Sequence, residues 1–327
     1  MLITQASALI RSRDELLDAG ASAAAISTAV ATAKLVRIDR GWYVEAEPWR
    51  RAYAEGRHLM RVLACERRRG GGSGLVYSYV SAAVLWGLPL WRIEPRCVHL
   101  SGAQASGHVH ASEPLVARHE VSVPEVDVAV IDGIRCTSLS RTVADLIRML
   151  GPQAALALAD AAMRLASWDE AARTYDADAA ETLRAAVAAR LPRGGRGVRR
   201  ARWILGLADG RSASPGESAS RVLLIEIGFR RIRLQSAVAS PTGGSYYLDF
   251  DLEEADAWGE YDGETKYLDE DMRDGDLEAV LLAEKQREDW IRGTTQRKLG
   301  RWGKVHIATA AALEQRLALF HIHPPKR

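Results

Sequence analysis

The feature that most constrains the fold is a strictly alternating stretch in the last third of the chain. The run YYLDFDL, which begins at Tyr246, has an apolar residue at every second position. Residues two apart in a strand point to the same face of a sheet. The leucines and the phenylalanine are therefore predicted to pack on one face, with Asp249 and Asp251 on the other. The pattern is typical of a half-buried β-strand.

Acidic residues continue beyond this strand. A second strand is expected at 257–261, and Glu260 and Asp262 would share one of its faces. Between Asp249 and Glu278 there are fourteen acidic residues and only two basic ones. Carboxylates from neighbouring strands repel one another unless a cation lies between them. Oxygen ligands suit Mg²⁺ or Mn²⁺, which could activate water at a phosphodiester. A solvated acidic hairpin stays open as the alternative, and Asp251 is interpreted as a surface carboxylate.

The elements around these strands predict an α/β sandwich. Ser214, Pro215 and Glu217 have the order of a helix start, with serine at the N-cap and glutamate three residues later. Further strands are predicted at 232–239 and 304–307, and helices at 277–292 and 310–318. The order helix, three strands, helix, strand, helix is an α/β arrangement. Glu217 also has a purely structural interpretation, in which it caps the Ser214 amide and pairs with Arg221.

The first 48 residues follow a winged-helix pattern. Helices are predicted at 14–19 and 22–33, the second with Ser22 as its N-cap, and a hairpin with Gly41 at its turn follows. The charged residues at the helix end and the wing are candidates for contacts with DNA. They are Lys34, Arg37 and Arg40.

Residues 49–208 are predicted to form an α/β middle domain, with a boundary before a third domain at 212–327. Within it, Arg141 is interpreted as a structural partner of Asp145. Its last part carries a run of arginines without any acidic residue between them: Arg184, Arg190, Arg193, Arg196, Arg199, Arg200 and Arg202. Of these, Arg193, Arg196, Arg199 and Arg200 are the candidate DNA contacts. Unpaired positive charges favour phosphate backbones, although a solvated linker would have the same composition.

Five stretches of the C-terminal part resemble the PD-(D/E)XK nuclease superfamily, in the branch similar to very-short-patch-repair (Vsr) endonucleases. They are SPGESASRVLL from Ser214, YLDFDL from Tyr247, WGEYDGETKY from Trp258, EKQREDWIR from Glu284 and GKVHI from Gly303. The resemblance covers about residues 214–317.

The resemblance implies a role for each acidic candidate. Asp249 would be the first metal carboxylate and Glu260 the second, and Asp262 stands where the superfamily has its lysine. Glu217 would reach the same site from its helix. The branch pattern Glu-x-Asp-Gly-x-x-His ends here in Lys266 instead of histidine. Lysine could still orient water or hold a phosphate, but the change puts hydrolysis in question.

The predicted helix after these strands carries two further candidates. Lys285 and Arg287 could contact a phosphate. Alternatively, the charged residues of this helix form pairs with one another on an exposed surface.

The N-terminal half resembles the type IV abortive-infection antitoxin (AbiEi) family. The resemblance rests on the segment up to GWYV at 41–44, on VSAAVLWGL from Val80 and on CTSLSRTVADL from Cys136, and it covers about residues 4–165. It implies a protein that binds promoter DNA and represses its own operon. The implied partner is a nucleotidyltransferase-like toxin.

Composition sets the remaining limits. The formal net charge is only +2, and the three cysteines are far apart, which is typical of buried thiols in a reducing compartment. No long apolar segment is present, so we expect a cytoplasmic protein without a membrane partner. The favoured hypothesis is DNA binding coupled to metal-dependent phosphodiester hydrolysis. The alternative is a non-enzymatic antitoxin or repressor whose nuclease fold only binds DNA or toxin.

Overall fold

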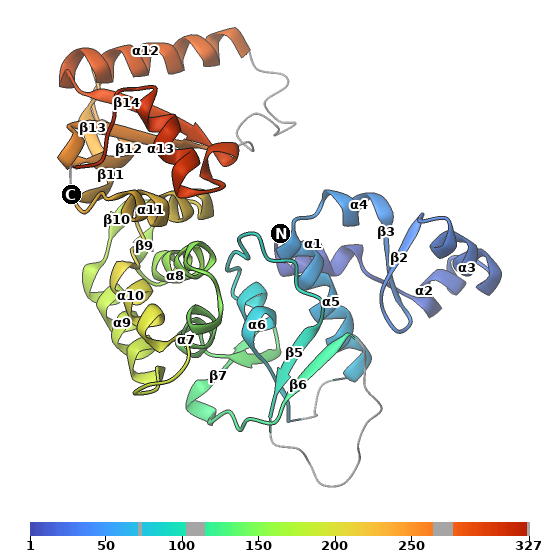
Figure 1. The fold of residues 1–327 in the computed structure, drawn as a ribbon. Coiled ribbons are helices and arrows are strands. Elements are labelled where there is room, and N and C mark those ends of the chain that lie inside the picture. The colour runs from blue at the N-terminus through green and yellow to red at the C-terminus, as the bar shows by residue number, and fades with distance from the viewer. Residues whose placement is uncertain (71–73, 103–114, 264–276, 326–327) are drawn as a thin grey trace. The chain divides into compact units, whose positions relative to one another are not determined.

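The computed structural model describes residues 1–70, 74–102, 115–263 and 277–325 (Figure 1). They form an α/β protein with several sheets, as predicted. The chain divides into two compact units. Unit 1 comprises Met1–Leu150 and Glu181–Gly206, and unit 2 comprises Gly151–Ala180 and Leu207–Arg327. The chain therefore crosses between units three times, and the predicted boundary at 208–212 lies near only the last crossing.

Unit 1 begins with a small module around a three-stranded sheet. Its elements are α1 (Ile3–Leu9), β1 (Arg11–Ser12), α2 (Arg13–Asp18), α3 (Ala23–Ala31), β2 (Leu35–Asp39) and β3 (Trp42–Glu45). The sheet order is β1-β3-β2, and both pairings are antiparallel. Ser22 caps α3 through the Ala25 amide, as predicted, and Gly41 has φ +78° at the hairpin turn.

The rest of unit 1 is built on a mixed five-stranded sheet of order β6-β5-β4-β8-β7. Its strands are β4 (Val76–Tyr77), β5 (Val98–Ser101), β6 (Val116–His119), β7 (Val128–Ile131) and β8 (Ile134–Thr137). Its helices are α4 (Ala46–Arg51), α5 (Ala54–Arg69), α6 (Tyr79–Leu85), the short η1 (Glu125–Asp127), α7 (Leu139–Met149), α9 (Ala177–Arg190) and α10 (Val198–Leu207). Helix α6 begins only at Tyr79, because Val76 and Tyr77 pair into the sheet.

The core of unit 1 contains histidines that the fold keeps uncharged. His58 is fully buried, and its Nε2 lies 2.9 Å from the Ser81 hydroxyl. His99 Nδ1 lies 2.9 Å from His119 Nε2. Burial lowers the pKa of His58 to about 3 and that of His99 to about 4. The core therefore requires the neutral form of both rings at neutral pH.

Unit 2 starts from α8 (Pro152–Ser167) and the short β9 (Trp168–Asp169) and β10 (Thr174–Tyr175). The predicted partnership of Arg221 with Glu217 is wrong. Arg221 on α11 (Pro215–Ile227) instead binds both oxygens of Asp160 on α8, at 2.8 and 2.9 Å. Both side chains are buried, and burial raises the pKa of Asp160 to about 6. This buried pair ties α8 to the C-terminal part of the chain.

The sheet of unit 2 has four strands in the order β11-β12-β13-β14. Its elements after α11 are β11 (Ile232–Ala239), β12 (Ser245–Leu252), η2 (Glu253–Ala255), β13 (Ala257–Asp262), α12 (Leu277–Thr295), β14 (Lys298–Gly303), η5 (Lys304–Ile307) and α13 (Ala310–Ala318). Only the pairing of β13 with β14 is parallel. Figure 1 shows α12 on one side of the sheet and α11 on the other.

The clean alternation predicted for β12 is broken in its middle. Leu248 packs into a cluster with Trp258 and with Ile291 of α12. Phe250 instead stacks on Trp302, whose indole donates to Ser220 of α11. The regular β11–β12 pairing is interrupted between these two positions, opposite Gln235, which has φ +50°. The prediction that the apolar residues share one face is therefore wrong, and the break lies at Asp249.

The last strand also differs from the prediction. Residues 304–307 form a 3₁₀ turn with Val305 exposed, and the strand is the preceding segment, β14. Glycines in the middle and at the end of that segment, Gly300 and Gly303, weaken its strand signal. In the part of the chain that the structure describes, no helix is both long and apolar enough to cross a membrane.

Candidate functional site

Glu260 lies at the centre of an ion-pair cluster in unit 2. Its side chain is almost buried, and Arg287 of α12 donates to its Oε1 at 2.6 Å. Arg301 of β14, its register partner across the parallel pairing, donates to Oε2 through Nε at 2.9 Å and through the terminal nitrogen at 2.8 Å. Arg301 also pairs with Glu284. Both oxygens of Glu260 are thus held by guanidinium groups.

The pKa values of the two arginines reflect this pairing. Burial lowers the pKa of Arg301, but the charge of Glu260 and the hydrogen bonds to Glu284 and Glu260 outweigh it and raise the pKa. Asp262, half-buried at the end of β13, adds to the same effect. For Arg287, burial again lowers the pKa and the hydrogen bond and charge of Glu260 raise it overall. Both guanidinium groups therefore remain charged beside Glu260.

Asp251 is not the surface carboxylate that we expected. It is 6% exposed and pairs with Arg297. The Arg297 guanidinium also stacks 3.7 Å from the centre of the Trp258 ring. A second acid of the predicted cluster is thus neutralised by its own arginine.

Asp249 and Glu217 come together at a different place. The Gln235 amide donates to Asp249 Oδ1 at 3.2 Å and reaches Glu217 Oε2 at 3.5 Å. The other Asp249 oxygen accepts from the Tyr261 backbone amide at 2.8 Å. Glu217 also accepts from the amide of Ala213 at 2.8 Å, one residue before the predicted Ser214 partner. The structure therefore brings Asp249 to Glu217, while Glu260 belongs to the arginine cluster.

These contacts allow a test of whether the residues fit Mg²⁺ or Mn²⁺. The metal would need free carboxylate oxygens that converge on one point. Both oxygens of Glu260 and both of Asp249 already accept hydrogen bonds from nitrogen donors. Among the described residues, no group of three histidines, cysteines or acids is arranged to hold a metal ion. Lys266 lies outside the described residues. The described oxygens of Glu260 and Asp249 are thus held by nitrogen donors, and the metal site stays a prediction.

The two candidates on α12 have different surroundings. Lys285 is exposed. Arg287 is held by Glu260 and by the Tyr247 carbonyl oxygen, at 3.0 Å. The guanidinium group of Arg287 is therefore part of the ion-pair cluster around Glu260. In unit 1, Arg141 pairs with Asp145 at 2.8 Å, as predicted, and also with Asp127.

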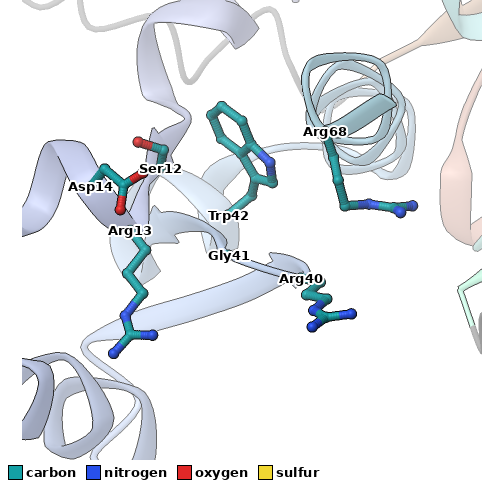
Figure 2. A pocket seen from close by; sticks show the side chains of 7 residues that line it. All are labelled: Ser12, Arg13, Asp14, Arg40, Gly41, Trp42 and Arg68. Atoms are coloured by element: carbon teal, nitrogen blue, oxygen red, sulfur yellow. The ribbon is translucent and has the colours of Figure 1, made fainter. Parts of the chain in front are cut away.

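An arginine-lined pocket lies between the N-terminal module and the end of α5. It has a volume of about 480 Å³, and its lining residues are Ser12, Arg13, Asp14, Arg40, Gly41, Trp42 and Arg68. Figure 2 shows its three arginines on three separate elements, namely the start of α2, the hairpin turn and the end of α5. Arg68 is oriented by Asp39 at 3.0 Å. The pocket thus combines the exposed Arg13 and Arg40 with Arg68, which Asp39 holds, and has Asp14 and the Trp42 ring in its lining.

The surface around this pocket is also basic. Lys34, Arg37 and Arg40 are all exposed, as is Arg13. Lys34, Arg40 and Arg13 form no ion pair within the described ranges. The neighbouring α3 buries Ile26 and exposes small uncharged side chains. The exposed face of α3 is therefore uncharged, and the basic residues belong to the neighbouring segments.

Comparison with known proteins adds little to this geometry. No protein-family model and no curated protein sequence matches the chain. A solved structure described as that of the RV2827C protein from Mycobacterium tuberculosis is similar over 71% of this chain and 84% of its own. The identity is 13% and the TM-score is 0.33.

Several residues of these sites were missed from the sequence. Arg297 directly precedes β14 and Arg301 lies within it, but the sequence predicts a strand only at 304–307, so no spacing rule points to their partners. Gln235 gave no signal, because a single glutamine in a strand has no distinctive spacing. Arg13 could have been found, since it directly follows the N-cap serine Ser12 at the start of a helix.

Proposed function

We propose that this protein binds duplex DNA through its N-terminal module and that its C-terminal sheet takes part in binding without hydrolysing DNA. The observation that carries the proposal is the pocket with Arg13, Arg40 and Arg68. Three guanidinium groups from three elements are suited to a phosphate backbone, because each can make bidentate hydrogen bonds. The order helix, strand, helix, helix, strand, strand supports a winged-helix mode of docking.

In this mode the charges and the helix have different tasks. The arginines would contact phosphates, which fixes the position of the protein but does not read sequence. Ser27 and Thr28 on the exposed face of α3 would face base edges, where hydroxyl and methyl groups can contact thymine or a polar edge. With no charged side chain on that helix, we expect modest sequence discrimination.

The non-hydrolytic part of the proposal rests on Glu260. A metal ion on its oxygens would have to share them with Arg287 and Arg301, which already donate to both. Two charges of the same sign as the metal would then lie beside it, which is unfavourable. Together with the resemblance to antitoxins, this supports a repressor-like protein whose partner is a nucleotidyltransferase-like toxin.

The DNA-binding part is tested with the full chain and a labelled duplex. Replacing Arg13 and Arg40 by Gln should remove two phosphate contacts and lower the slope of log K against log salt by about 2. The matched control replaces Arg50 and Arg51, which are also exposed but already paired with Glu47. Equal binding by both variants and the wild type would exclude this pocket as the interface.

The non-hydrolytic part is tested with plasmid and single-stranded DNA in the presence of Mg²⁺ or Mn²⁺. We expect no cleavage above background by the wild type and no change in Glu260→Ala. Cleavage that needs the metal and disappears in Glu260→Ala would overturn this part of the proposal and restore the nuclease hypothesis. The DNA-binding result would be unaffected.

A further inference from the structure

A second charged surface lies on α10 and the loop before it. Five arginines are exposed there, followed by a tryptophan that is 40% exposed: Arg193, Arg196, Arg199, Arg200, Arg202 and Trp203. We call this set the α10 surface. The opposite side of α10 buries Val198, Ala201, Ile204 and Leu205. The helix is therefore anchored by one face and presents the other to solvent.

The five arginines differ from the two that precede them in the run. Arg190 pairs with Asp127 at 2.7 Å and Arg184 with Glu181 at 3.1 Å. None of the five has an acidic partner among the residues that the structure describes. The sequence from residue 182 to residue 208 contains no acid. Like charges gathered without counterions favour a polyanionic partner.

Backbone contacts hold this surface in place. Arg200 donates to the carbonyl oxygen of Arg148 at 3.0 Å, and Arg202 donates to that of Pro192 at 3.2 Å. Gly197, with φ +79°, packs so tightly on Arg148 that a side chain would collide with it. The charged face is thus preorganised, which reduces the entropy lost on binding.

Two features indicate the kind of polyanion. Arg199, Arg202 and Trp203 are three and four positions apart, so they share one face of the helix. An exposed indole among arginines can stack on an unpaired base while the arginines hold the backbone. Gly194 and Gly195 have open space where a side chain would lie, which allows close approach of a phosphate to the main chain.

We infer that the α10 surface binds single-stranded nucleic acid, with phosphates on its arginines and a base on Trp203. This site does not depend on the duplex interface of the N-terminal module. Neither base edges nor the 2′-hydroxyl is needed for such binding, so the shared ligand chemistry is an unpaired polynucleotide, whether DNA or RNA.

The test measures binding of the full chain to fluorescent oligo(dT), oligo(rU) and a duplex. If all five arginines contact phosphates, log K for the single strands should fall with log salt with a slope of about 3.5 in magnitude. Changing Arg193, Arg196, Arg199 and Arg202 to Gln should reduce the magnitude of that slope by about 3. Trp203→Ala should weaken binding about tenfold, and Trp203→Phe should restore most of the loss. A comparison of the affinities for oligo(dT) and oligo(rU) shows whether the ligand is DNA or RNA.

Three controls keep the result interpretable. Changing the same four arginines to Lys should retain most of the binding, because the positive charge contributes more to phosphate binding here than the guanidinium geometry does. Circular dichroism verifies that the variants are folded. Changing Arg13 and Arg40 to Gln should leave single-strand binding intact, which separates this site from the duplex site. Equal competition by poly-glutamate, unchanged binding in Trp203→Ala, or no binding of single strands at low salt would each overturn the inference.

Discussion

The two units differ in how they use charge. Unit 2 buries ions in pairs, as in Asp160 with Arg221 and in Glu260 with two arginines. Unit 1 also pairs Asp127 with Arg141 and Arg190, but it keeps the histidines of its core neutral and leaves its α10 arginines exposed. Arginine is thus a structural residue in unit 2 and at Asp127, and a candidate binding residue on the α10 surface. The difference follows from the acids within reach, which a count of arginines along the sequence does not reveal.

Acid should give the largest effect and should separate the two units. In unit 1, folding holds the pKa of His58 and His99 far below 6.5. The unfolded chain therefore binds protons first, and each histidine should cost about 1.4 kcal/mol of stability per pH unit below about 6.5. In unit 2, burial raises the pKa of Asp160 to about 6. Its folded form takes up the proton first, so this group adds stability as pH falls from about 6 to about 4.

Hydrogen exchange of each unit between pH 7 and pH 4.5 tests this contrast. We expect the amides around β5 and α6 in unit 1 to lose protection before those of α8 and α11. A matched variant, His58→Gln, should lower the stability at pH 7 and make it less dependent on acid. Loss of protection in unit 2 first would show that the contrast between the cores is wrong.

The second effect concerns Glu260. Removal of one partner leaves the other charge buried, so Glu260→Ala and Arg301→Gln should each destabilise unit 2 by about 3 kcal/mol. A metal site predicts the opposite sign for Glu260→Ala in the absence of metal, because a repelling carboxylate would be removed. Thermal denaturation with and without Mg²⁺ distinguishes these cases. The double variant Glu260→Gln with Arg301→Gln should recover part of the loss, and strict additivity would argue against direct coupling.

The smallest effect is expected at the α10 surface. Replacing Arg193, Arg196, Arg199 and Arg202 by Gln should change the free energy of unfolding by no more than about 0.5 kcal/mol. A slight rise is expected at low salt, where these charges repel most. Urea denaturation at two salt concentrations measures it. A loss of several times this size would mean that the arginines stabilise the fold, as those of unit 2 do.

The sequence predicted local features well. The serine caps of α3 and α11, the first hairpin and the Arg141–Asp145 pair all depend on residues a few positions apart. The partners of Glu260 lie 27 and 41 positions away, beyond any spacing rule.

The break in β12 was hidden for a similar reason. The break lies opposite Gln235, which belongs to the neighbouring strand and has a positive φ. The alternation of residues within β12 does not indicate it. Contacts between elements, rather than within them, therefore give Asp249 and Glu260 different partners.

The passage of the chain between the units has a consequence for its synthesis. Helix α8 is complete at Ser167, but its partner α11 begins only at Pro215. At ribosomal speed the interval is roughly several seconds, during which the apolar face of α8 has no native cover. Asp160 is also synthesised with α8 and has no ion-pair partner until Arg221 of α11 has been synthesised. Exposed apolar surface favours aggregation, so we expect a chaperone that shields α8 to help the nascent protein at this stage.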